Sequence, residues 1–164
     1  NELEKGYFNS GVLLINTLAW AQESVSAKAM SMLADKAIVS RLTYMDQDIL
    51  NLILLGKVKF IDAKYNTQFS LNYELKKSFV CPINDETVLI HYVGPTKPWH
   101  YWAGYPSAQP FIKAKEASPW KNEPLMRPIN SNYARYCAKH NFKQNKPING
   151  IMNYIYYFYL KIIK

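Results

Sequence analysis

The segment from Val88 to His100 constrains the fold of this chain more than any other. Its first residues, Val88-Leu89-Ile90, form a short apolar run bounded by turn formers, which predicts a buried strand that ends near His91. Gly94 then lets the backbone approach a ligand closely, and two prolines stiffen the loop. A polar loop directly after a buried strand is typical of sites at the carboxyl ends of strands in α/β sheets.

His91 and Lys97 lie six residues apart around this loop. Imidazole is a common transition-metal ligand, and a lysine ammonium is a point charge suited to phosphate. The pair therefore describes half of a metal–diphosphate site. A lone histidine in a polar loop is more often a hydrogen-bonded structural residue, so the hypothesis depends on the whole segment and not on His91 alone.

The chain before Tyr105 alternates predicted strands and helices, which favours an α/β layer. Phe8–Asn16 and Val58–Ile61 are expected to be strands, and the polar, aromatic stretch Asp62–Tyr73 is expected to be a loop. Apolar residues at helical spacing predict one helix that begins after Asn16 or Thr17; they are Leu18, Ala21, Val25, Ala29 and Met32.

Asp46-Gln47-Asp48 is expected to open a second helix, with Asp46 as its N-cap and Gly56 at its end. Two carboxylates that flank an amide would bind sugar hydroxyls and face a developing positive charge. Acidic residues also cap helix N-termini, where the macrodipole favours them, and this simpler role is the alternative. Asn9 adds an amide next to Ser10-Gly11, a pattern that alone indicates only the start of a strand.

Beyond Tyr105 the composition changes. A helix is expected over residues 106–117, then a linker broken by Pro119, Pro124 and Pro128, then two helices over 132–143 and 149–161. Cys81 and Cys137 have no metal-site spacing. The sequence contains no glycine-rich phosphate loop, HExxH motif or nucleophile elbow. Its four tryptophans form no stacking series with basic residues, so nucleic acid is not expected as a partner.

The basic character of the chain belongs to its C-terminal part, because residues 121–164 carry +7 of the net charge of +8. Residues 154–159 include four tyrosines and a phenylalanine, and lysines bracket them at Lys139, Lys143, Lys146, Lys161 and Lys164. Tyrosine favours the membrane interface, and each lysine there attracts anionic headgroups by roughly 1 kcal/mol. The alternatives are a reversible membrane anchor and a helix pair with a solvated basic face; a lipid-linked, phosphorylated acceptor would favour the anchor.

Four motifs in order resemble the retaining glycosyltransferases of family 8, and most closely the bacterial lipopolysaccharide core galactosyl- and glucosyltransferases. They are Tyr7-Phe8-Asn9-Ser10-Gly11-Val12-Leu13-Leu14-Ile15-Asn16, Asp46-Gln47-Asp48-Ile49-Leu50-Asn51, Tyr65-Asn66 and His91-Tyr92-Val93-Gly94-Pro95-Thr96-Lys97-Pro98-Trp99. Ser10 stands where the family usually has alanine. With the basic tail included, the resemblance covers nearly the whole chain.

The resemblance implies an α/β fold in which residues 1–104 are the C-terminal half of a Rossmann-like nucleotide-sugar transferase domain (type A). Residues 105–164 would be a small, basic and aromatic helical extension. The family's N-terminal half supplies uridine-binding strands and a DxD metal motif. Asp46-Gln47-Asp48 has the DxD pattern, but its place at a helix start, followed by Ile-Leu-Asn, argues against the metal-binding role, so neither feature is recognised in this sequence. We therefore expect a truncated or processed chain that is inactive by itself.

The resemblance also implies roles for residues around the donor's leaving group. His91 would be the metal ligand from this half, completing a site for Mn²⁺ (or Mg²⁺) with the carboxylates of the missing segment. Gly94 and Lys97 would contact the diphosphate of a UDP-sugar.

Around the transferred sugar, the resemblance implies binding by Asn9 and Asp46 and catalytic roles for Gln47 and Asp48. Asp48 is the candidate to stabilise, or transiently bond, the anomeric carbon, which becomes oxocarbenium-like in the transition state. Retention through a double displacement and retention through same-face attack both remain open.

The expected function is transfer of a hexose from UDP-galactose or UDP-glucose to the outer core of lipopolysaccharide, with an α-1,3-galactosyltransferase preferred. An α-1,2-glucosyltransferase and a non-catalytic, basic membrane-binding module are the alternatives. The expected partners are the UDP-hexose, the lipopolysaccharide core acceptor and an anionic membrane surface. The expected location is cytoplasmic, peripheral on the inner face of the bacterial inner membrane.

Overall fold

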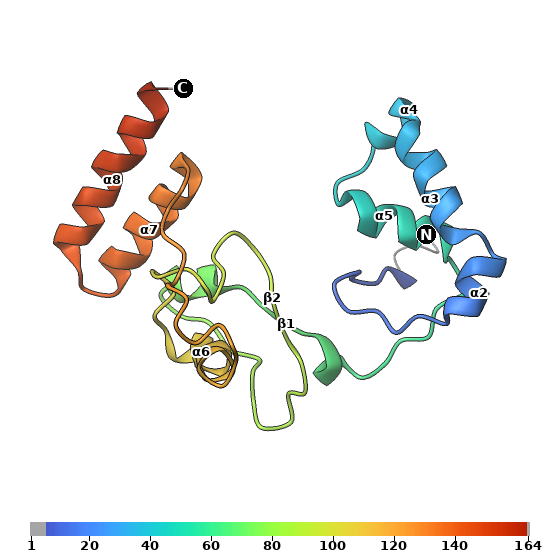
Figure 1. Cartoon of the computed structure of the whole chain (residues 1–164), viewed down its shortest axis with the longest axis horizontal. Coiled ribbons are helices and arrows are strands. Elements are labelled where there is room, and N and C mark those ends of the chain that lie inside the picture. Colours follow the sequence, from blue (N-terminus) through green and yellow to red (C-terminus); the bar gives the residue numbers. More distant parts are fainter. Residues whose placement is uncertain (1–5, 164) are drawn as a thin grey trace. The chain divides into compact units, whose positions relative to one another are not determined.

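The computed structural model describes residues 6–163 and divides the chain into two compact units, Asn1–Asn66 and Thr67–Lys164 (Figure 1). We call them the N-terminal unit and the C-terminal unit. Helices dominate both, and the described strands form a two-stranded parallel sheet in the C-terminal unit. A mixed helix-and-strand fold is thus confirmed.

The N-terminal unit is helical. It consists of α2 (Thr17–Gln22), α3 (Val25–Ala34), α4 (Lys36–Val39), α5 (Met45–Ile53) and the 3₁₀ turn η1 (Ala63–Asn66). The predicted cap of the first helix is confirmed, because the Asn16 side chain accepts a hydrogen bond from the backbone N–H of Ala19 at 3.1 Å. Helix α3 packs against α5, and the buried side chains Val25 and Ile49 come from these two helices.

The strand predicted over Phe8–Asn16 is wrong. This segment is irregular, and Leu14 is 93% exposed. Both backbone groups of Phe8 bond to the side-chain amide of Asn51 on α5, so a helix side chain takes the place of a neighbouring strand. The strand predicted over Val58–Ile61 is also wrong, since those residues are irregular and two of their apolar side chains are exposed.

Both helix predictions in this unit need correction, the first in its middle and the second at its ends. The first predicted helix is split into α2 and α3 at Ser24, whose φ of 52° is left-handed and ends the first run. The second, α5, begins at Met45 with Tyr44 as its N-cap, so Asp46 is not the cap but lies in the first turn. Helix α5 ends at Ile53, and Gly56 comes after it with a φ of 74°.

The C-terminal unit contains β1 (Thr67–Phe69) and β2 (Ile90–Tyr92), which pair in parallel with Gln68 opposite His91. The strand predicted over Val88–His91 is therefore confirmed only in part: it begins at Ile90, and the predicted burial is wrong, because Val88 and Leu89 lie before it and are exposed. The predicted loop over 62–73 is wrong in part, because it contains β1 and two 3₁₀ turns, η1 and η2 (Leu71–Leu75). The core beside the sheet contains Phe69, Leu71, Ala103, Tyr105 and Ala108.

The predicted helices of the C-terminal part are confirmed. They are η3 (Pro106–Ala108) continuing into α6 (Gln109–Glu116), α7 (Ser131–Lys143) and α8 (Pro147–Ile162), and Figure 1 shows α7 beside α8. Gly150 allows their close approach, since a Cβ there would lie 2.6 Å from the ring of Phe142. The proline-rich linker before α7 is irregular except for a bridge between His100 and Met126.

Candidate functional site

In the N-terminal unit, the first turn of α5 holds the segment after Tyr7 through side-chain hydrogen bonds. The Gln47 Oε1 atom accepts from the Asn9 amide at 2.8 Å and from the backbone N–H of Ser10 at 3.1 Å. Asp46 accepts from the Ser10 hydroxyl at 3.0 Å. The structure thus brings Asn9, Asp46 and Gln47 together, as expected for residues of one site.

Asp48 lies next to this group and is surrounded by hydrogen-bond donors. Its Oδ2 atom accepts from the backbone N–H groups of Thr43 and Tyr44, both at 2.7 Å, and its Oδ1 atom accepts from the Tyr7 hydroxyl at 2.5 Å. These bonds, that of Tyr7 foremost, lower the pKa of the Asp48 carboxyl, so the group is an anion at neutral pH. Asp48 therefore satisfies backbone donors at the start of α5, as the simpler capping alternative supposed, and carries a full negative charge.

Sequence reasoning missed Asn51 as a part of this arrangement. Its side chain is 3% exposed, accepts from the Phe8 N–H, and donates to the carbonyls of Phe8 and Gln47. Asn9 in turn accepts from the Asn66 amide at 3.2 Å. The available signal was the spacing of Gln47 and Asn51, four residues apart and thus on one helix face.

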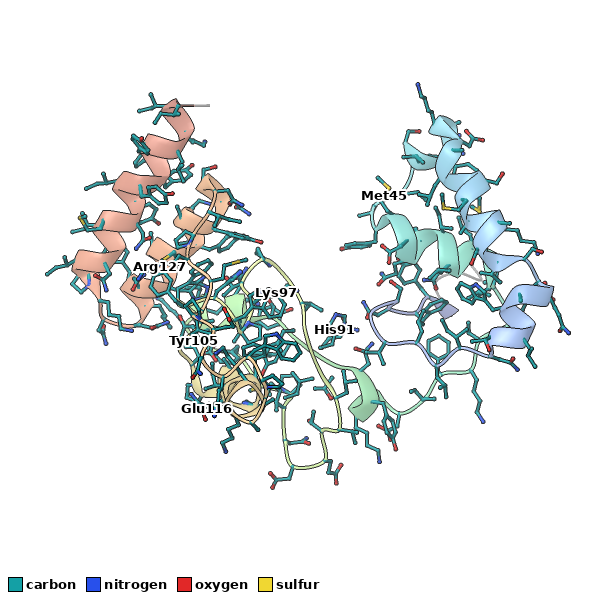
Figure 2. The ribbon with its side chains drawn as sticks, in the orientation of Figure 1. Met45, His91, Lys97, Tyr105, Glu116 and Arg127 are labelled. Atoms are coloured by element: carbon teal, nitrogen blue, oxygen red, sulfur yellow. The ribbon has the colours of Figure 1, made fainter. Side chains whose placement is uncertain are left out.

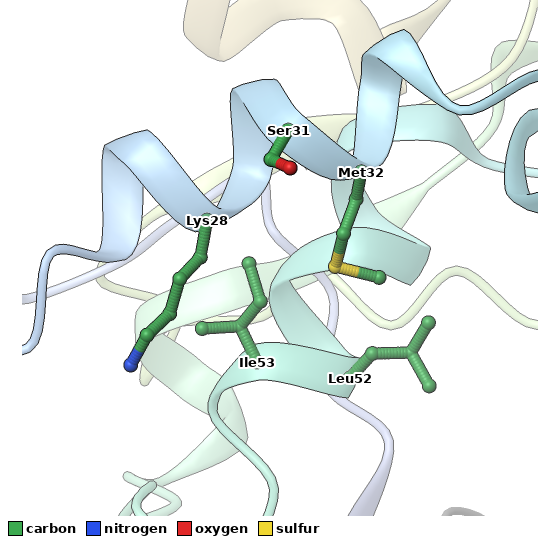
Figure 3. A pocket seen from close by; sticks show the side chains of 5 residues that line it. All are labelled: Lys28, Ser31, Met32, Leu52 and Ile53. Carbon is green, nitrogen blue, oxygen red and sulfur yellow. The ribbon is translucent and has the colours of Figure 1, made fainter.

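Two pockets adjoin the face where α3 meets α5. One of about 580 Å³ has Tyr7, Arg41, Thr43 and Asp48 in its lining, with apolar side chains making up the rest. Figure 3 shows the other, of about 420 Å³, lined by Lys28, Ser31, Met32, Leu52 and Ile53. The larger pocket places the Asp48 carboxylate and a cationic Arg41 on the wall of one space.

In the C-terminal unit, Gly94 begins the loop that follows β2. Its φ of 82° lies in the left-handed region, and a Cβ would lie 2.7 Å from the Ser70 hydroxyl. The backbone conformation therefore favours glycine, and a side chain here would also force the Ser70 hydroxyl to turn aside. Before it, the Val93 N–H donates to the Phe69 carbonyl at 3.0 Å, so the loop leaves a fixed sheet edge.

Lys97 lies in the same loop with its side chain turned back to the strand, where Nζ donates to the Tyr92 carbonyl at 2.7 Å. Figure 2 labels Lys97 and His91 on this strand-and-loop segment. Burial lowers the pKa of the Lys97 ammonium. Within the described part of the C-terminal unit no carboxylate forms a salt bridge with it. A partly desolvated cation of this kind is suited to an anionic ligand such as a diphosphate.

His91 extends from β2, and burial, followed by the charge of Lys97, lowers the pKa of its imidazole. The ring is therefore neutral at pH 7, which is the form that binds a divalent metal ion. Among residues 6–163, no group of three or more histidine, cysteine, aspartate or glutamate side chains is arranged to hold a metal ion.

The predicted site residues consequently fall into two groups. Asn9, Asp46, Gln47 and Asp48 meet in the N-terminal unit, while His91 on β2 and Gly94 and Lys97 in the loop after it belong to the C-terminal unit. The first group offers amides and carboxylates for hydroxyl groups and for positive charge. The second offers a cation and a neutral imidazole for a metal-bound phosphate.

The outer face of α8 is the largest apolar feature near the C-terminal end of the chain. Seven side chains at helical spacing are each more than half exposed: Ile148, Ile151, Met152, Ile155, Phe158, Tyr159 and Ile162. We call them the α8 stripe. Lys146 and Lys161 lie at the two ends of the helix, and Lys164 lies outside the described residues. No helix among the described residues is long and apolar enough to cross a bilayer.

Comparison with known proteins gives matches over both parts of the chain. Residues 1–103 match the model of glycosyl transferase family 8, and residues 105–161 match that of the C-terminal region of the same family. No solved structure matches the chain.

The curated relatives include the following three, whose names state an activity. A lipopolysaccharide glucosyltransferase of Escherichia coli K12 is 55% identical over 161 residues, which cover 98% of this chain and 48% of the relative. A lipopolysaccharide 1,3-galactosyltransferase of Salmonella typhimurium is 51% identical, over 99% of this chain and 48% of the relative. A lipopolysaccharide 1,2-glucosyltransferase of Escherichia coli is 38% identical, over 94% and 47%. The chain spans about half the length of these relatives.

Proposed function

Because the chain belongs to glycosyltransferase family 8, we propose that its protein transfers a hexose from a UDP-sugar to the outer core of lipopolysaccharide. The observation that carries this proposal is the loop from His91 to Lys97, in which an enforced glycine conformation precedes a partly buried cation. A UDP-sugar presents a diphosphate, the anion that this loop is suited to bind.

The names of the relatives include both glucosyl and 1,3-galactosyl transfer, which supports a hexose as the transferred sugar. The sequence resemblance favours an α-1,3-galactosyltransferase, and an α-1,2-glucosyltransferase, for which a less similar relative is named, is the alternative. The fold that corresponds to this function is a Rossmann-like type A domain with residues 1–104 in its C-terminal half. Residues 105–164 would form the family's C-terminal extension.

Breaking the bond between sugar and phosphate develops negative charge on the UDP leaving group. In the proposed site the Lys97 ammonium stabilises that charge, while Gly94 lets the backbone come close to the phosphates. A divalent ion such as Mn²⁺ or Mg²⁺ would add Lewis-acid stabilisation of the same charge, and His91 is the residue of this chain that would hold it.

On the sugar side, the anomeric carbon becomes positive as the leaving group departs. The Asp48 carboxylate is anionic at neutral pH and is the proposed stabilising group. Asn9, Asp46 and Gln47 present amide and carboxylate groups that suit the hydroxyls of a hexose. The hydrogen bonds from Asn9 to Gln47 and from Ser10 to Asp46 hold the group in a fixed arrangement before any ligand arrives.

We also propose that the protein lies on the inner face of the bacterial inner membrane. The α8 stripe supplies apolar side chains for the interface, and the surrounding lysines supply charge for anionic headgroups. The same surface favours the competing idea of a non-catalytic membrane-binding module, in which the loop around His91 would have no role.

The function is tested by assaying the full-length protein, as its gene encodes it, with UDP-galactose and UDP-glucose and defined lipopolysaccharide core acceptors. His91→Ala is expected to weaken dependence on manganese and to lower transfer by orders of magnitude with the fold intact. Lys97→Met is expected to raise the KM for the UDP-sugar about tenfold or more, because a charge-assisted contact is lost.

Lys115→Met is the matched control, since Lys115 also donates to backbone carbonyls, those of Trp120 and Lys121, away from the loop. Its KM should equal that of the unmodified protein. Transfer that is unaffected by both His91→Ala and Lys97→Met would exclude the proposed donor site. Liposome binding without any transfer would favour the non-catalytic module.

A further inference from the structure

We propose that His140 on α7 is a positioning residue that fixes the donor-binding loop Gly94–Lys97 by holding the side chain of Thr96. This inference rests on the proposed function of the loop. It gives the C-terminal extension a role within the donor site, separate from any contact with a membrane.

Thr96 connects the loop to α7. It is fully buried, and its Oγ1 atom lies 3.1 Å from His140 Nε2. In sequence it stands directly before Lys97 and two residues after Gly94, the two residues proposed to contact the diphosphate. A displacement of Thr96 therefore moves the backbone of both contacts.

His140 is held from both sides of its ring. The Tyr105 hydroxyl lies 2.7 Å from Nδ1, and Nε2 lies 3.2 Å from the Asn72 amide oxygen as well as near Thr96. An amide oxygen only accepts hydrogen bonds, so Nε2 carries the proton and Nδ1 accepts from Tyr105. His140 thus donates toward Thr96 and Asn72 from a ring that cannot rotate.

The buried position keeps this arrangement in one protonation state. His140 has no solvent-exposed surface, and burial, with smaller contributions from the charges of His100 and Lys139, lowers the pKa of its imidazole to about 4. The ring is therefore neutral across the physiological range and keeps one donor and one acceptor.

The contact through Thr96 lies between two other attachments of the loop. At its start, the Val93 N–H bonds to the Phe69 carbonyl; at its end, the Lys97 N–H donates to His100 Nδ1 at 3.1 Å. Both attachments join residues of the sheet and loop region itself. The contact between Thr96 and His140, in contrast, joins the middle of the loop to α7.

The experiment compares four variants of the full-length protein. Thr96→Val removes the hydrogen bond at nearly the same volume. His140→Phe removes it from the other side with a larger, apolar ring, and His140→Gln keeps a neutral donor. Tyr101→Phe is the matched control, because the Tyr101 hydroxyl contacts Cys137 on α7 at 3.0 Å but does not contact the loop from Gly94 to Lys97.

Two quantities are measured: steady-state KM and kcat with varied UDP-sugar, and hydrogen–deuterium exchange of the peptide spanning residues 91–98 without ligand. Thr96→Val and His140→Phe should raise KM about tenfold with kcat changed far less. The reason is that the loop loses roughly one buried hydrogen bond that holds it in position for the donor. They should also speed exchange in that peptide. His140→Gln should recover much of both effects, and Tyr101→Phe should lower the melting temperature while leaving both readouts unchanged.

Unchanged loop exchange in His140→Phe would overturn the inference, whatever the activity. An equal rise of KM in Tyr101→Phe would also overturn it, since the effect would then be general destabilisation. The unmodified protein could transfer no sugar while His140→Phe still speeds hydrogen–deuterium exchange of the loop. The proposed function would then be wrong, but the conclusion that His140 fixes the loop would remain supported.

Discussion

Gly94 and Ser70 approach each other so closely that any side chain at Gly94 would collide with the Ser70 hydroxyl, its Cβ lying 2.7 Å from Oγ. Gly94→Ala is therefore expected to destabilise the C-terminal unit by about 1–3 kcal/mol, from the left-handed φ and the collision together. The rate of sugar transfer should fall by more than the loss of folded protein explains, because the loop that bears Lys97 must shift. Urea unfolding and donor KM measure the two effects.

The collision and the backbone strain can be separated. Ser70→Ala combined with Gly94→Ala removes the colliding hydroxyl but keeps the φ of 82°, so it should recover only part of the lost stability. Gly104→Ala is the control, since the nearest atom to its Cβ would be 3.6 Å away, on Gln144. A Gly94→Ala protein as stable as the unmodified one would contradict the close approach.

Asp48 can be tested for its two roles, at the start of α5 and beside the sugar. Tyr7→Phe removes one hydrogen bond and keeps both backbone bonds from Thr43 and Tyr44, so it should raise the pKa of Asp48 with little loss of helix. Asp48→Asn keeps an acceptor for the backbone but removes the charge. It should lower kcat by orders of magnitude if the carboxylate stabilises the anomeric carbon, with the helix content unchanged by circular dichroism.

The outcome of that comparison separates capping from chemistry. Asp48→Asn could lose helical signal and show a kcat lowered only in proportion to the remaining folded protein. That result would mean that Asp48 only caps the start of α5 and has no role in catalysis. A full loss of turnover in a protein with unchanged helix content would support the catalytic role.

The stability of the C-terminal unit is expected to depend on pH through two buried histidines. Burial lowers the pKa of His140 and of His100 to about 4, below the ordinary value of 6.5. Between pH 6.5 and 4 the unfolded chain binds protons that the folded chain does not, so stability falls as the pH falls through this range and levels off above it. The loss for His140 is on the order of 3 kcal/mol.

Urea unfolding followed by tryptophan fluorescence measures this dependence, because Trp102 is buried and stacks on His100 at 4.2 Å. His140→Gln should remove about half of the dependence between pH 6.5 and 4. A free energy of unfolding that stays constant over this range would show that the two imidazoles are not buried in neutral form.

The membrane proposal is tested on the α8 stripe without disturbing the core. Replacing Ile151, Ile155 and Phe158 by serine should release the protein from anionic liposomes at low salt, because exposed apolar area for the interface is lost. Raising the salt concentration should weaken the binding of the unmodified protein, since the lysine contribution is screened. Sedimentation with liposomes reports both.

The matched control replaces Val80 and Ile129, which are exposed apolar residues of the same unit but lie outside the stripe. That variant should still bind. If the variant with serines in the α8 stripe bound liposomes as well as the unmodified protein, the proposal that α8 anchors the protein to the membrane would be wrong. Deleting α7 and α8 is a poorer test, because α7 contributes Ala134, Cys137 and His140 to the buried interior.

Where local signals are strong, the sequence predicts the structure well. The helices α6 (counted with η3), α7 and α8 lie within two residues of the predicted ranges, because helix signals act within a few residues. The strand β2 was predicted near its place, although only Ile90 of the apolar run Val88-Leu89-Ile90 belongs to it. The order of the four motifs was enough for the family, which the comparisons confirm over residues 1–103 and 105–161.

Strands other than β2 were predicted poorly, because a strand exists only when another backbone pairs with it. Phe8–Asn16 has the composition of a strand, yet the amide of Asn51 takes the backbone groups of Phe8. Thr67–Phe69 has little apolar character, yet it becomes β1 because β2 pairs with it across 20 intervening residues. Pairing of this kind is decided by tertiary contacts and not by local preference.

The same limit applies to the loop from His91 to His100. The sequence by itself determined its residue types: an imidazole, a glycine free to adopt positive φ, and a lysine, which together indicate a metal–diphosphate site. Only the tertiary structure decided how the loop is held, because Thr96 and His140 lie 44 residues apart in the chain and meet in a buried hydrogen bond at 3.1 Å. A hydrogen bond between distant residues depends on how whole helices and sheets pack, which no local pattern encodes.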